Sequence, residues 1–328
     1  MILLLLGCAG PGPSRHTEPV PFTETLDPDA IHILAAGSPA PGDPGHPLTE
    51  LSLGLDPRWS LDLDDDDGIA DALRFADGST VYARSALPPN FDAALERVEA
   101  DGSLDWSQDA FLGGVPTFLH GLALSPDGDY VVTDPIQARV VSVSEAGDVQ
   151  WELSFRDDAG NRLPNGIDIA TGPDGVARLV VSLLVFETSD LYEGVEVYRL
   201  GGRTEVPTLE WAFFGGPGST DRRWPHGPRF LDDGSVMVSF AALGQVAHLV
   251  DGELDWVVPE EPGVLAFPRD VQVLPDGTWL VADGASEVLR IFDPLGRFEV
   301  VDAARTPGVF GLSLVTCGDG GGLPCLDG

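Results

Sequence analysis

Lysine is absent from this chain of 328 residues, and cysteine and methionine are scarce, at three and two residues. All 18 basic residues are therefore arginine, and against 53 acidic residues they leave a formal net charge of −35. Binding to phosphate-rich polymers depends on positive patches that release counterions, so we expect no nucleic-acid partner. Helical periodicity is also rare, since only residues 91–100 would allow a helical turn or two. These absences favour an all-β protein.

Tryptophan recurs at a regular interval, each time in a short apolar segment that follows a turn. The recurring residues are Trp59, Trp106, Trp151, Trp211 and Trp256, and Phe298 takes the next place. Their spacings are 47, 45, 60, 45 and 42 residues. A unit of roughly 45 residues is therefore repeated six times. The repeat predicts a six-bladed β-propeller.

An Asp-Gly pair separates two β-rich segments in five of these units. The pairs are Asp77-Gly78, Asp127-Gly128, Asp174-Gly175, Asp233-Gly234 and Asp276-Gly277. Asp-Gly supplies the positive φ values of a tight hairpin, and the flanking Val, Leu, Tyr and Trp residues suit half-buried strands. We therefore expect each unit to be a four-stranded antiparallel blade, within one propeller domain over residues 30–316.

The two ends of the repeat region complement each other. Residues 309–316 have the character of an inner strand with no outer strands after it, whereas the segment around Trp59 resembles an outer strand with no blade before it. We expect the N-terminal strands of residues 30–63 to join the C-terminal blade. Such pairing would remove two open sheet edges.

The chain begins MILLLLGCAG, in which Leu5-Leu6-Gly7-Cys8 resembles the lipobox of bacterial lipoproteins. The resemblance implies a signal over residues 1–8 and a lipid anchor on Cys8, in the cell envelope. The Ala that follows the cysteine is typical of outer-membrane sorting. An ordinary signal remnant is the alternative. Residues 9–29 are rich in Pro and Gly, so we expect a tether.

Cys317 and Cys325 remain, in the segment TCGDGGGLPCLDG. Two thiols in an exported chain favour a disulfide, which would stabilise the tail of residues 317–328 by roughly 2.5 kcal/mol through loop closure. A metal site is the competing interpretation, but no His or third Cys lies nearby.

The innermost strand of each propeller blade borders the central channel, so residues at one repeat position converge there. Seven residues before the turn aspartate, this position holds His120, His226 and Arg269, and Asn165 takes it in another unit. We expect these polar groups to surround one mouth of the channel, with His120, His226 and Arg269 as candidate catalytic residues. The alternative is that they satisfy strand-end carbonyls between blades.

Three stretches resemble known propeller families. WLVADGASEVLRIFDPLGRF resembles an NHL repeat, HGLALSPDGDYVV followed by GDVQWEL is similar to bacterial arylsulfate sulfotransferases, and LPNGIDIATGPDG resembles gluconolactonase-like propellers. The NHL resemblance implies a binding module whose loops hold a small molecule, a glycan or a protein. The sulfotransferase resemblance implies a nucleophilic channel His and an Arg that neutralises the sulfuryl oxygens. The lactonase resemblance implies a channel Ca²⁺ ion held by Asn165 and Asp270.

We rank the ligand- or protein-binding module first, the sulfotransferase-like enzyme second and the metal-dependent lactonase-like hydrolase third. The first two interpretations need no cofactor. We expect a monomer anchored by lipid at the outer membrane, on its periplasmic or its exterior side. The position of the four channel residues is the feature that separates these interpretations.

Overall fold

The computed structural model describes residues 31–37, 48–52, 57–61, 63, 68–75, 77–85, 92–115, 117–157, 160–185, 193–214, 224–259, 263–274, 279–285, 288–292, 298–299 and 309–316. The expected signal, tether and C-terminal tail lie outside these residues, and so do Cys8, Cys317, Cys325 and the Asp276-Gly277 pair. The lipid anchor and the disulfide therefore stay predictions.

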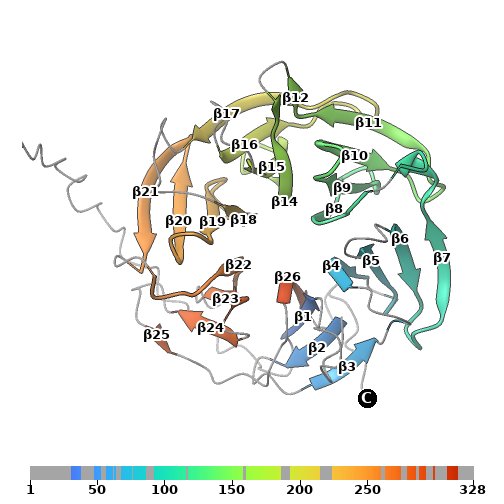
Figure 1. Ribbon diagram of the computed structural model, residues 1–328, viewed down its shortest axis with the longest axis horizontal. Coiled ribbons are helices and arrows are strands. Elements are labelled where there is room, and N and C mark those ends of the chain that lie inside the picture. The colour runs from blue at the N-terminus through green and yellow to red at the C-terminus, as the bar shows by residue number, and fades with distance from the viewer. Residues whose placement is uncertain are drawn as a thin grey trace, which may run out of the picture.

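The described strands form a ring of sheets around a central axis (Figure 1). Six of these sheets have four strands, and a two-stranded ribbon of β12 (Arg156–Asp157) and β13 (Gly160–Asn161) accompanies them. Every strand pair within the four-stranded sheets is antiparallel. The expected all-β propeller with four-stranded antiparallel blades is confirmed.

Each sheet extends from the channel outward in a fixed order. The first blade contains β4 (Gly68–Arg74), β5 (Thr80–Ser85), β6 (Ala93–Val98) and β7 (Leu104–Gln108); the next contains β8 (Leu122–Leu124), β9 (Tyr130–Asp134), β10 (Arg139–Val143) and β11 (Val149–Ser154); then come β14 (Leu163–Thr171), β15 (Ala177–Leu184), β16 (Gly194–Arg199) and β17 (Thr208–Phe214). They are followed by β18 (Pro225–Phe230), β19 (Val236–Phe240), β20 (Gln245–Val250) and β21 (Glu253–Val258), and by β22 (Pro268–Val273), β23 (Trp279–Asp283), β24 (Val288–Phe292) and β25 (Phe298–Glu299).

The remaining sheet joins the two ends of the described chain. β26 (Val309–Thr316) lies next to the axis, and β1 (Ile31–Gly37), β2 (Leu48–Ser52) and β3 (Pro57–Leu61) follow it outward. β1 pairs with β26 over most of its length, with Ile33 opposite Leu314 and Ala35 opposite Leu312. This is the pairing that the complementary ends of the sequence lead one to expect.

The repeated aromatic residues mark the outermost strand of each sheet. Trp59 lies on β3, Trp106 on β7, Trp151 on β11, Trp211 on β17, Trp256 on β21 and Phe298 on β25. The Asp-Gly pairs lie between the first and second strands, and Gly78, Gly128, Gly175 and Gly234 have φ between 74° and 86°. A glycine is therefore needed at these four turns.

The helical expectation for residues 91–100 is wrong. Within this segment Ala93–Val98 form β6, which pairs with both β5 and β7. Ala93, Ala94 and Leu95 are all buried, because both faces of the strand are covered by other parts of the ring. Burial between sheets has overridden the helix propensity of Ala and Leu. One short 3₁₀-helix, at Ala110–Leu112, was not expected.

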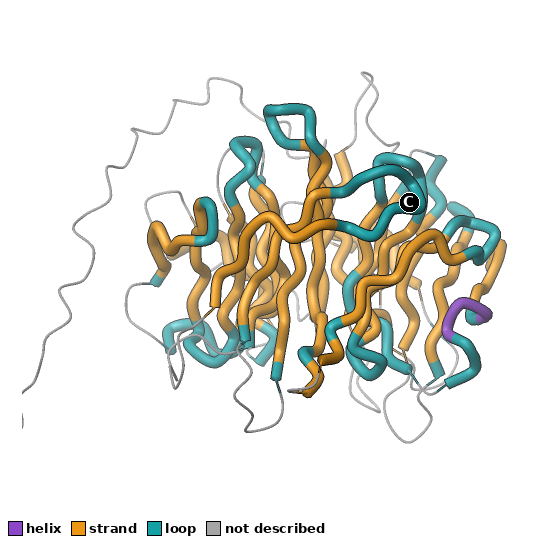
Figure 2. The backbone as a smooth tube through the Cα atoms, turned by 90° about the horizontal axis from the view of Figure 1, so that it is seen from above, coloured by secondary structure: helices purple, strands orange, loops and turns teal. Residues whose placement is uncertain are grey.

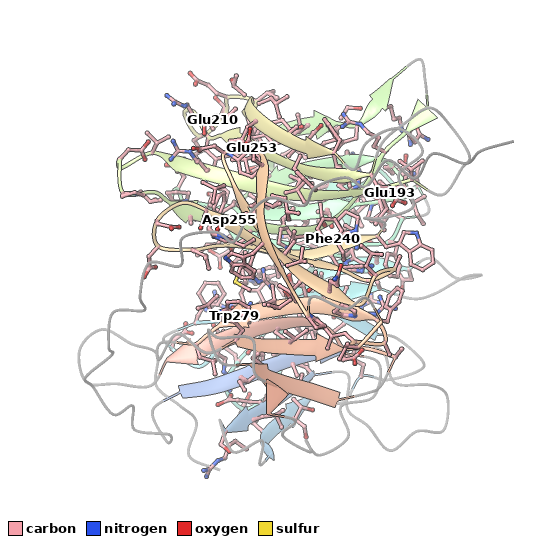
Figure 3. All side chains as sticks on the ribbon, turned by 90° about the vertical axis from the view of Figure 1, so that its left-hand side faces the viewer. Glu193, Glu210, Phe240, Glu253, Asp255 and Trp279 are labelled. Atoms are coloured by element: carbon pink, nitrogen blue, oxygen red, sulfur yellow. The ribbon has the colours of Figure 1, made fainter. Side chains whose placement is uncertain are left out.

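The hydrophobic core is divided into clusters that lie between neighbouring sheets. Phe240 packs with Val195 and Phe213 of the preceding blade, whereas Trp279 packs with Met237 and Val246 of β19 and β20. Figure 3 shows Phe240 and Trp279 from the outer side of β21. Each blade thus buries both its faces against its neighbours, which is how a ring of this length avoids a single oversized core.

The strands span the thickness of the ring and the loops gather at its two ends (Figure 2). Within the described residues, the structure contains no helix with the length and apolarity that crossing a bilayer requires. At one end of the ring the inner strands begin, and this end carries the candidate site.

Candidate functional site

The sequence-predicted residues His120, Asn165, His226 and Arg269 meet at the start of the inner strands. His120 directly precedes Gly121 and β8, Asn165 lies on β14, His226 on β18 and Arg269 on β22. The rings of His120 and His226 have centroids 6.1 Å apart, and the Asn165 amide nitrogen contacts Nδ1 of His226. Four neighbouring blades therefore contribute one side chain each to a common mouth.

Hydrogen bonds of Thr133 hold the backbone around His120 and Asn165 in place. The N–H of His120 donates to the carbonyl of Thr133 at 3.2 Å, and the N–H of Gly121 donates to Oγ1 of Thr133 at 2.6 Å. That hydroxyl in turn donates to the carbonyl of Asn165 at 2.7 Å. Thr133 thus ties the strand that carries Asn165 to the blade of His120.

Arg269 is held by an aromatic ring. Its guanidinium lies over Phe267, with 4.8 Å from the central carbon to the ring centroid, and the same ring is 5.6 Å from the His226 ring. Gly284 makes room for the arginine, since a Cβ there would lie 3.0 Å from the Cδ and Nε of Arg269. Phe118 packs near His120 with 5.9 Å between centroids. The mouth is therefore lined by aromatic rings as well as polar groups.

The electrostatic environment keeps both histidines neutral. Burial, followed by the charge of Arg269, lowers the pKa of His120 to about 3, although a hydrogen bond with the Asn165 backbone acts in the opposite direction. Burial, followed by His120 and Arg269, holds the pKa of His226 well below its ordinary value. Burial also lowers the pKa of Arg269 to about 10, so this guanidinium is charged at neutral pH. The mouth thus presents two neutral imidazoles beside a cation.

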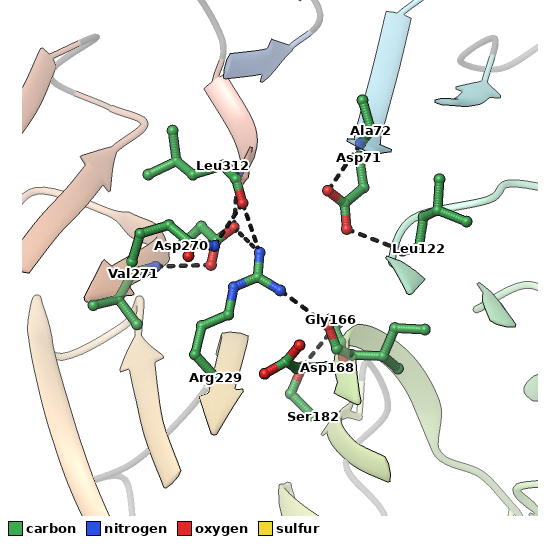
Figure 4. A network of polar contacts seen from close by, with 12 residues as sticks. Asp71, Ala72, Leu122, Gly166, Asp168, Ser182, Arg229, Asp270, Val271 and Leu312 are labelled. Carbon is green, nitrogen blue, oxygen red and sulfur yellow. Dashed lines mark hydrogen bonds and ion pairs between the residues drawn. The ribbon is translucent and has the colours of Figure 1, made fainter. Parts of the chain in front are cut away.

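A small cavity lies on the axis below these side chains. His120, Arg229, Arg269 and Asp270 contribute to its lining, and its volume of about 10 Å³ admits about one water molecule. Arg229 spans the channel beneath it (Figure 4): it donates to the Ile167 carbonyl at 3.1 Å, to Asp270 at 2.5 Å and to the Leu312 carbonyl at 2.9 Å. Arg229 therefore forms a floor.

At this floor three aspartates each join one inner strand to the next. Asp71 accepts the N–H of Leu122 at 2.9 Å, Asp270 accepts that of Leu312 at 2.8 Å, and Asp168 accepts that of Phe230 at 2.8 Å. Burial, opposed by Arg229 and reinforced by Asp270, raises the pKa of Asp71 to about 7. The pKa of Arg229 is raised by Asp270, Asp168 and Asp71, which outweigh its burial.

Glycines allow this close approach of the inner strands. A Cβ on Gly227, whose φ is 41°, would lie 2.6 Å from Cα of Asp270, and one on Gly311 would lie 2.8 Å from the carbonyl oxygen of Ala70. A Cβ on Gly166 would lie 2.7 Å from the backbone nitrogen of Gly227. The inner strands therefore touch at the level of the floor, directly below the mouth.

The metal interpretation of Asn165 and Asp270 does not fit this geometry. Asp270 accepts the N–H of Val271 with Oδ1 and both the Leu312 N–H and Arg229 with Oδ2, so a metal ion would have to compete with three hydrogen bonds and with the Arg229 charge. Asn165 turns its amide nitrogen to His226. Across the described residues, His, Cys, Asp and Glu form no group of three or more that could hold a metal ion.

Sequence reasoning missed Arg229 and Asp168, which complete the floor. Both lie three residues after a mouth residue, in HGPR and NGID. A Gly or Asp directly after each mouth position, as in Gly227 and Asp270, was also present in the sequence. Comparing the repeat position by position, beyond its first polar residue, would have shown this second layer.

A further histidine lies on β20, in contact with Trp256 of the outermost strand. His248 contacts Asp255 through Nδ1 at 3.0 Å and Ser235 through Nε2 at 2.7 Å, and it stacks on Trp256. A serine that contacts a histidine, which in turn contacts an aspartate, is the arrangement of a nucleophilic triad. However, the Ser235 hydroxyl donates to Asp233 of its own turn at 2.5 Å, so we assign this cluster a structural role.

Comparisons with known proteins support the fold. The sequence matches no protein-family profile and no curated protein. Among solved structures, a protein of unknown function from Bacteroides caccae has a TM-score of 0.59 at 15% identity, covering 87% of this chain and 98% of its own. A putative 6-phosphogluconolactonase from Bacteroides fragilis has 0.57 at 12%, covering 89% and 100%. A periplasmic gluconolactonase from Pseudomonas aeruginosa has 0.55 at 15%, covering 88% and 100%. At these identities the likeness shows a shared β-propeller fold.

Proposed function

We propose that this chain is a ligand-binding β-propeller of the bacterial cell envelope, and that the mouth of its channel binds a small anion. The observation that supports this most is the convergence of His120, Asn165, His226 and Arg269 from four blades. Four hydrogen-bonding groups from equivalent repeat positions meet here at one point, and convergent polar groups of this kind are typical of binding sites.

An anion fits the charges at this point. Burial alone lowers the pKa of Arg269, which means that its charge is poorly solvated. A bound anion would offset that loss of solvation and accept hydrogen bonds from the guanidinium fork. Neutral imidazoles and the Asn165 amide add hydrogen-bonding groups without adding charge. The carboxylates of the floor are engaged by Arg229 and by backbone N–H groups, so they repel an incoming anion less than separate carboxylates would.

Anion titration of the full chain tests this function. We expect the imidazole NMR signals of His120 and His226 to shift in a saturable way with acetate or sulfate. Arg269→Gln should weaken binding by about tenfold or more, because it removes a partly buried charged partner. Arg199→Gln is the matched control, since Arg199 is exposed and pairs with Glu210 on an outer strand. Shifts that are linear, or unchanged in Arg269→Gln, would rule the site out.

A sulfotransferase-like enzyme is the second candidate, because two imidazoles and the Arg269 guanidinium lie together around the Phe267 ring at one mouth of the channel. A neutral imidazole nitrogen can attack the sulfur of an aryl sulfate; the bond from sulfur to the phenolic oxygen breaks, and the phenolate leaves. A second phenol then takes the sulfuryl group from the imidazole, and its proton passes to the phenolate released in the first step, so the imidazole returns to its neutral form. Arg269 would neutralise the sulfuryl oxygens.

Release of 4-nitrophenol from 4-nitrophenyl sulfate, in the presence of a phenol, tests this chemistry. Turnover that is lost in His120→Ala or in His226→Ala would favour the enzyme. Anion binding without turnover would leave the binding module. The lactonase-like alternative is not proposed, although two of the similar structures are named as lactonases, because Asp270 already uses both its oxygens in the floor.

A further inference from the structure

Trp224 stands apart from the other six tryptophans of the chain. It is 38% exposed, whereas the others are buried or half-buried. Its φ is +61°, a left-handed conformation that bulky residues rarely adopt. The residue directly precedes β18, two positions before His226. An exposed, strained aromatic residue at the edge of a candidate site is the type of feature that function retains.

Two hydrogen bonds hold this conformation. The N–H of Trp224 donates to a carboxylate oxygen of Glu193 at 2.9 Å, and its carbonyl accepts the N–H of Ala241 at 3.0 Å. Glu193 belongs to the preceding blade and lies at the opposite end of the ring from Glu210 (Figure 3). Neighbouring segments therefore fix the backbone and with it the direction of the indole ring.

The indole ring begins a chain of aromatic contacts that ends at the candidate site. Trp224 meets Phe267 edge-on, with centroids 5.6 Å apart and an interplanar angle of 65°. Phe267 in turn lies 5.6 Å from His226 and carries the Arg269 guanidinium over its ring at 4.8 Å. A chain of ring contacts thus runs from the exposed indole through Phe267 to the cation and the imidazole.

The small axial cavity makes this surface relevant to the ligand. Because the axial cavity admits about one water molecule, a ligand does not enter it, and its charged group must meet the partly exposed Arg269 from the rim side. The rest of the ligand must lie outside, against the rim. We infer that Trp224 and Phe267 form a wall that selects anions carried on a flat aromatic body, a specificity that rests on the proposed anion site. Aromatic rings favour edge-on or offset contact with such a body.

Calorimetric titration of the full chain with acetate, benzoate and 2-naphthoate tests the wall. We expect affinity to rise by about tenfold or more from acetate to 2-naphthoate as the aromatic body grows. Trp224→Gly should remove most of that gain and leave acetate affinity within about twofold, since the carboxylate contacts stay. Glycine adopts a positive φ without strain, so this variant should fold; Trp224→Asn, which also tolerates that conformation, serves as a second version.

Leu104→Ala is the control, because Leu104 is 60% exposed on the outer strand β7 and should leave all three affinities unchanged. Equal affinity for the three carboxylates would overturn the wall and leave the anion site standing. So would a naphthoate preference that persists in both Trp224 variants. Absence of binding by all three carboxylates would overturn the anion site together with the wall.

Discussion

The channel has two levels, the floor around Arg229 and the mouth around Arg269, which differ in how their charges are balanced. At the floor, the Arg229 guanidinium is engaged by Asp270 and by backbone carbonyls, and the aspartates accept backbone N–H groups of the next blade. At the mouth, one to three residues earlier along these strands, the polar groups are neutral imidazoles and an amide, and Arg269 rests on an aromatic ring. The same inner strands carry both levels.

The difference separates a structural role from a binding role. Buried charges that neutralise one another stabilise one arrangement of the strands, and removing one partner leaves the others unpaired. Polar groups whose pKa is perturbed by burial are typical of functional sites, and their environment changes when a ligand binds. We therefore expect changes at the floor to act mainly on stability and changes at the mouth to act mainly on binding.

Loss of Arg229 should have the largest effect. Arg229→Met leaves Asp71, Asp168 and Asp270 without their common cation, and we expect the free energy of unfolding to fall by about 3–5 kcal/mol. Denaturant unfolding at pH 7 measures it. Arg199→Gln, at an exposed ion pair, should change stability by less than about 1 kcal/mol. A similar small loss in Arg229→Met would show that the floor does not hold the ring together.

A methyl group at the contact between inner strands should come next. Gly227→Ala places a Cβ against the backbone of Asp270 and needs a positive φ, so we expect a loss of about 3 kcal/mol. Gly128→Ala needs a positive φ as well but has open space around the added atom, and should lose about 1 kcal/mol. Equal losses, measured by thermal unfolding, would contradict the close approach described here.

The pH dependence of stability distinguishes the two levels by sign. The folded-state pKa of His120 is lowered to about 3, so its contribution is complete above the unfolded value near 6.5 and is lost as the pH falls below it. Asp71 acts oppositely, because its pKa is raised to about 7: stability decreases as the pH rises from about 4 to 7. These contributions oppose each other between about pH 4 and 6.5.

Replacing His120 should reveal that opposition. In His120→Leu the stability relative to the natural chain should improve by about 2–3 kcal/mol on going from pH 8 to pH 4.5, since the leucine cannot be protonated in the unfolded state. Denaturant titrations of both chains at the two pH values measure this change. A constant difference between the chains would mean that the imidazole titrates normally in the folded protein.

The link that Thr133 makes between the blades of His120 and Asn165 should have the smallest effect. Thr133→Val removes the hydroxyl that accepts the N–H of Gly121 and donates to the Asn165 carbonyl, and we expect a loss of about 1–2 kcal/mol. Anion affinity should decline with it if Asn165 and His120 need this support. Unchanged affinity would show that the mouth is positioned by its own strands.

The fold could be predicted because its signals are local and repeated. The tryptophans of the outer strands and the Asp-Gly turns depend on neighbours within one unit, so their period was visible. The same repeat placed His120, Asn165, His226 and Arg269 at equivalent positions. The strand at residues 91–100 was misjudged because its Ala and Leu residues favour a helix until neighbouring sheets cover them.

The pairing of the floor residues could not be predicted, although their repeat positions could, because their partners come from distant blades. Asp71 binds a strand 51 residues away and Arg229 reaches the Leu312 carbonyl 83 residues away. Neither spacing forms a motif in the sequence. The conformation of Trp224 likewise depends on Glu193, a contact that exists only after two blades have packed.

The sheet that contains both β26 and β1–β3 pairs segments that are far apart in the sequence. Leu61, the last residue of β3, and Val309, the first of β26, are separated by 248 positions. Closing so long a loop costs conformational entropy before the contact is gained, so we expect this sheet to form late in folding. Until then β1, β2 and β3 lack their innermost partner β26.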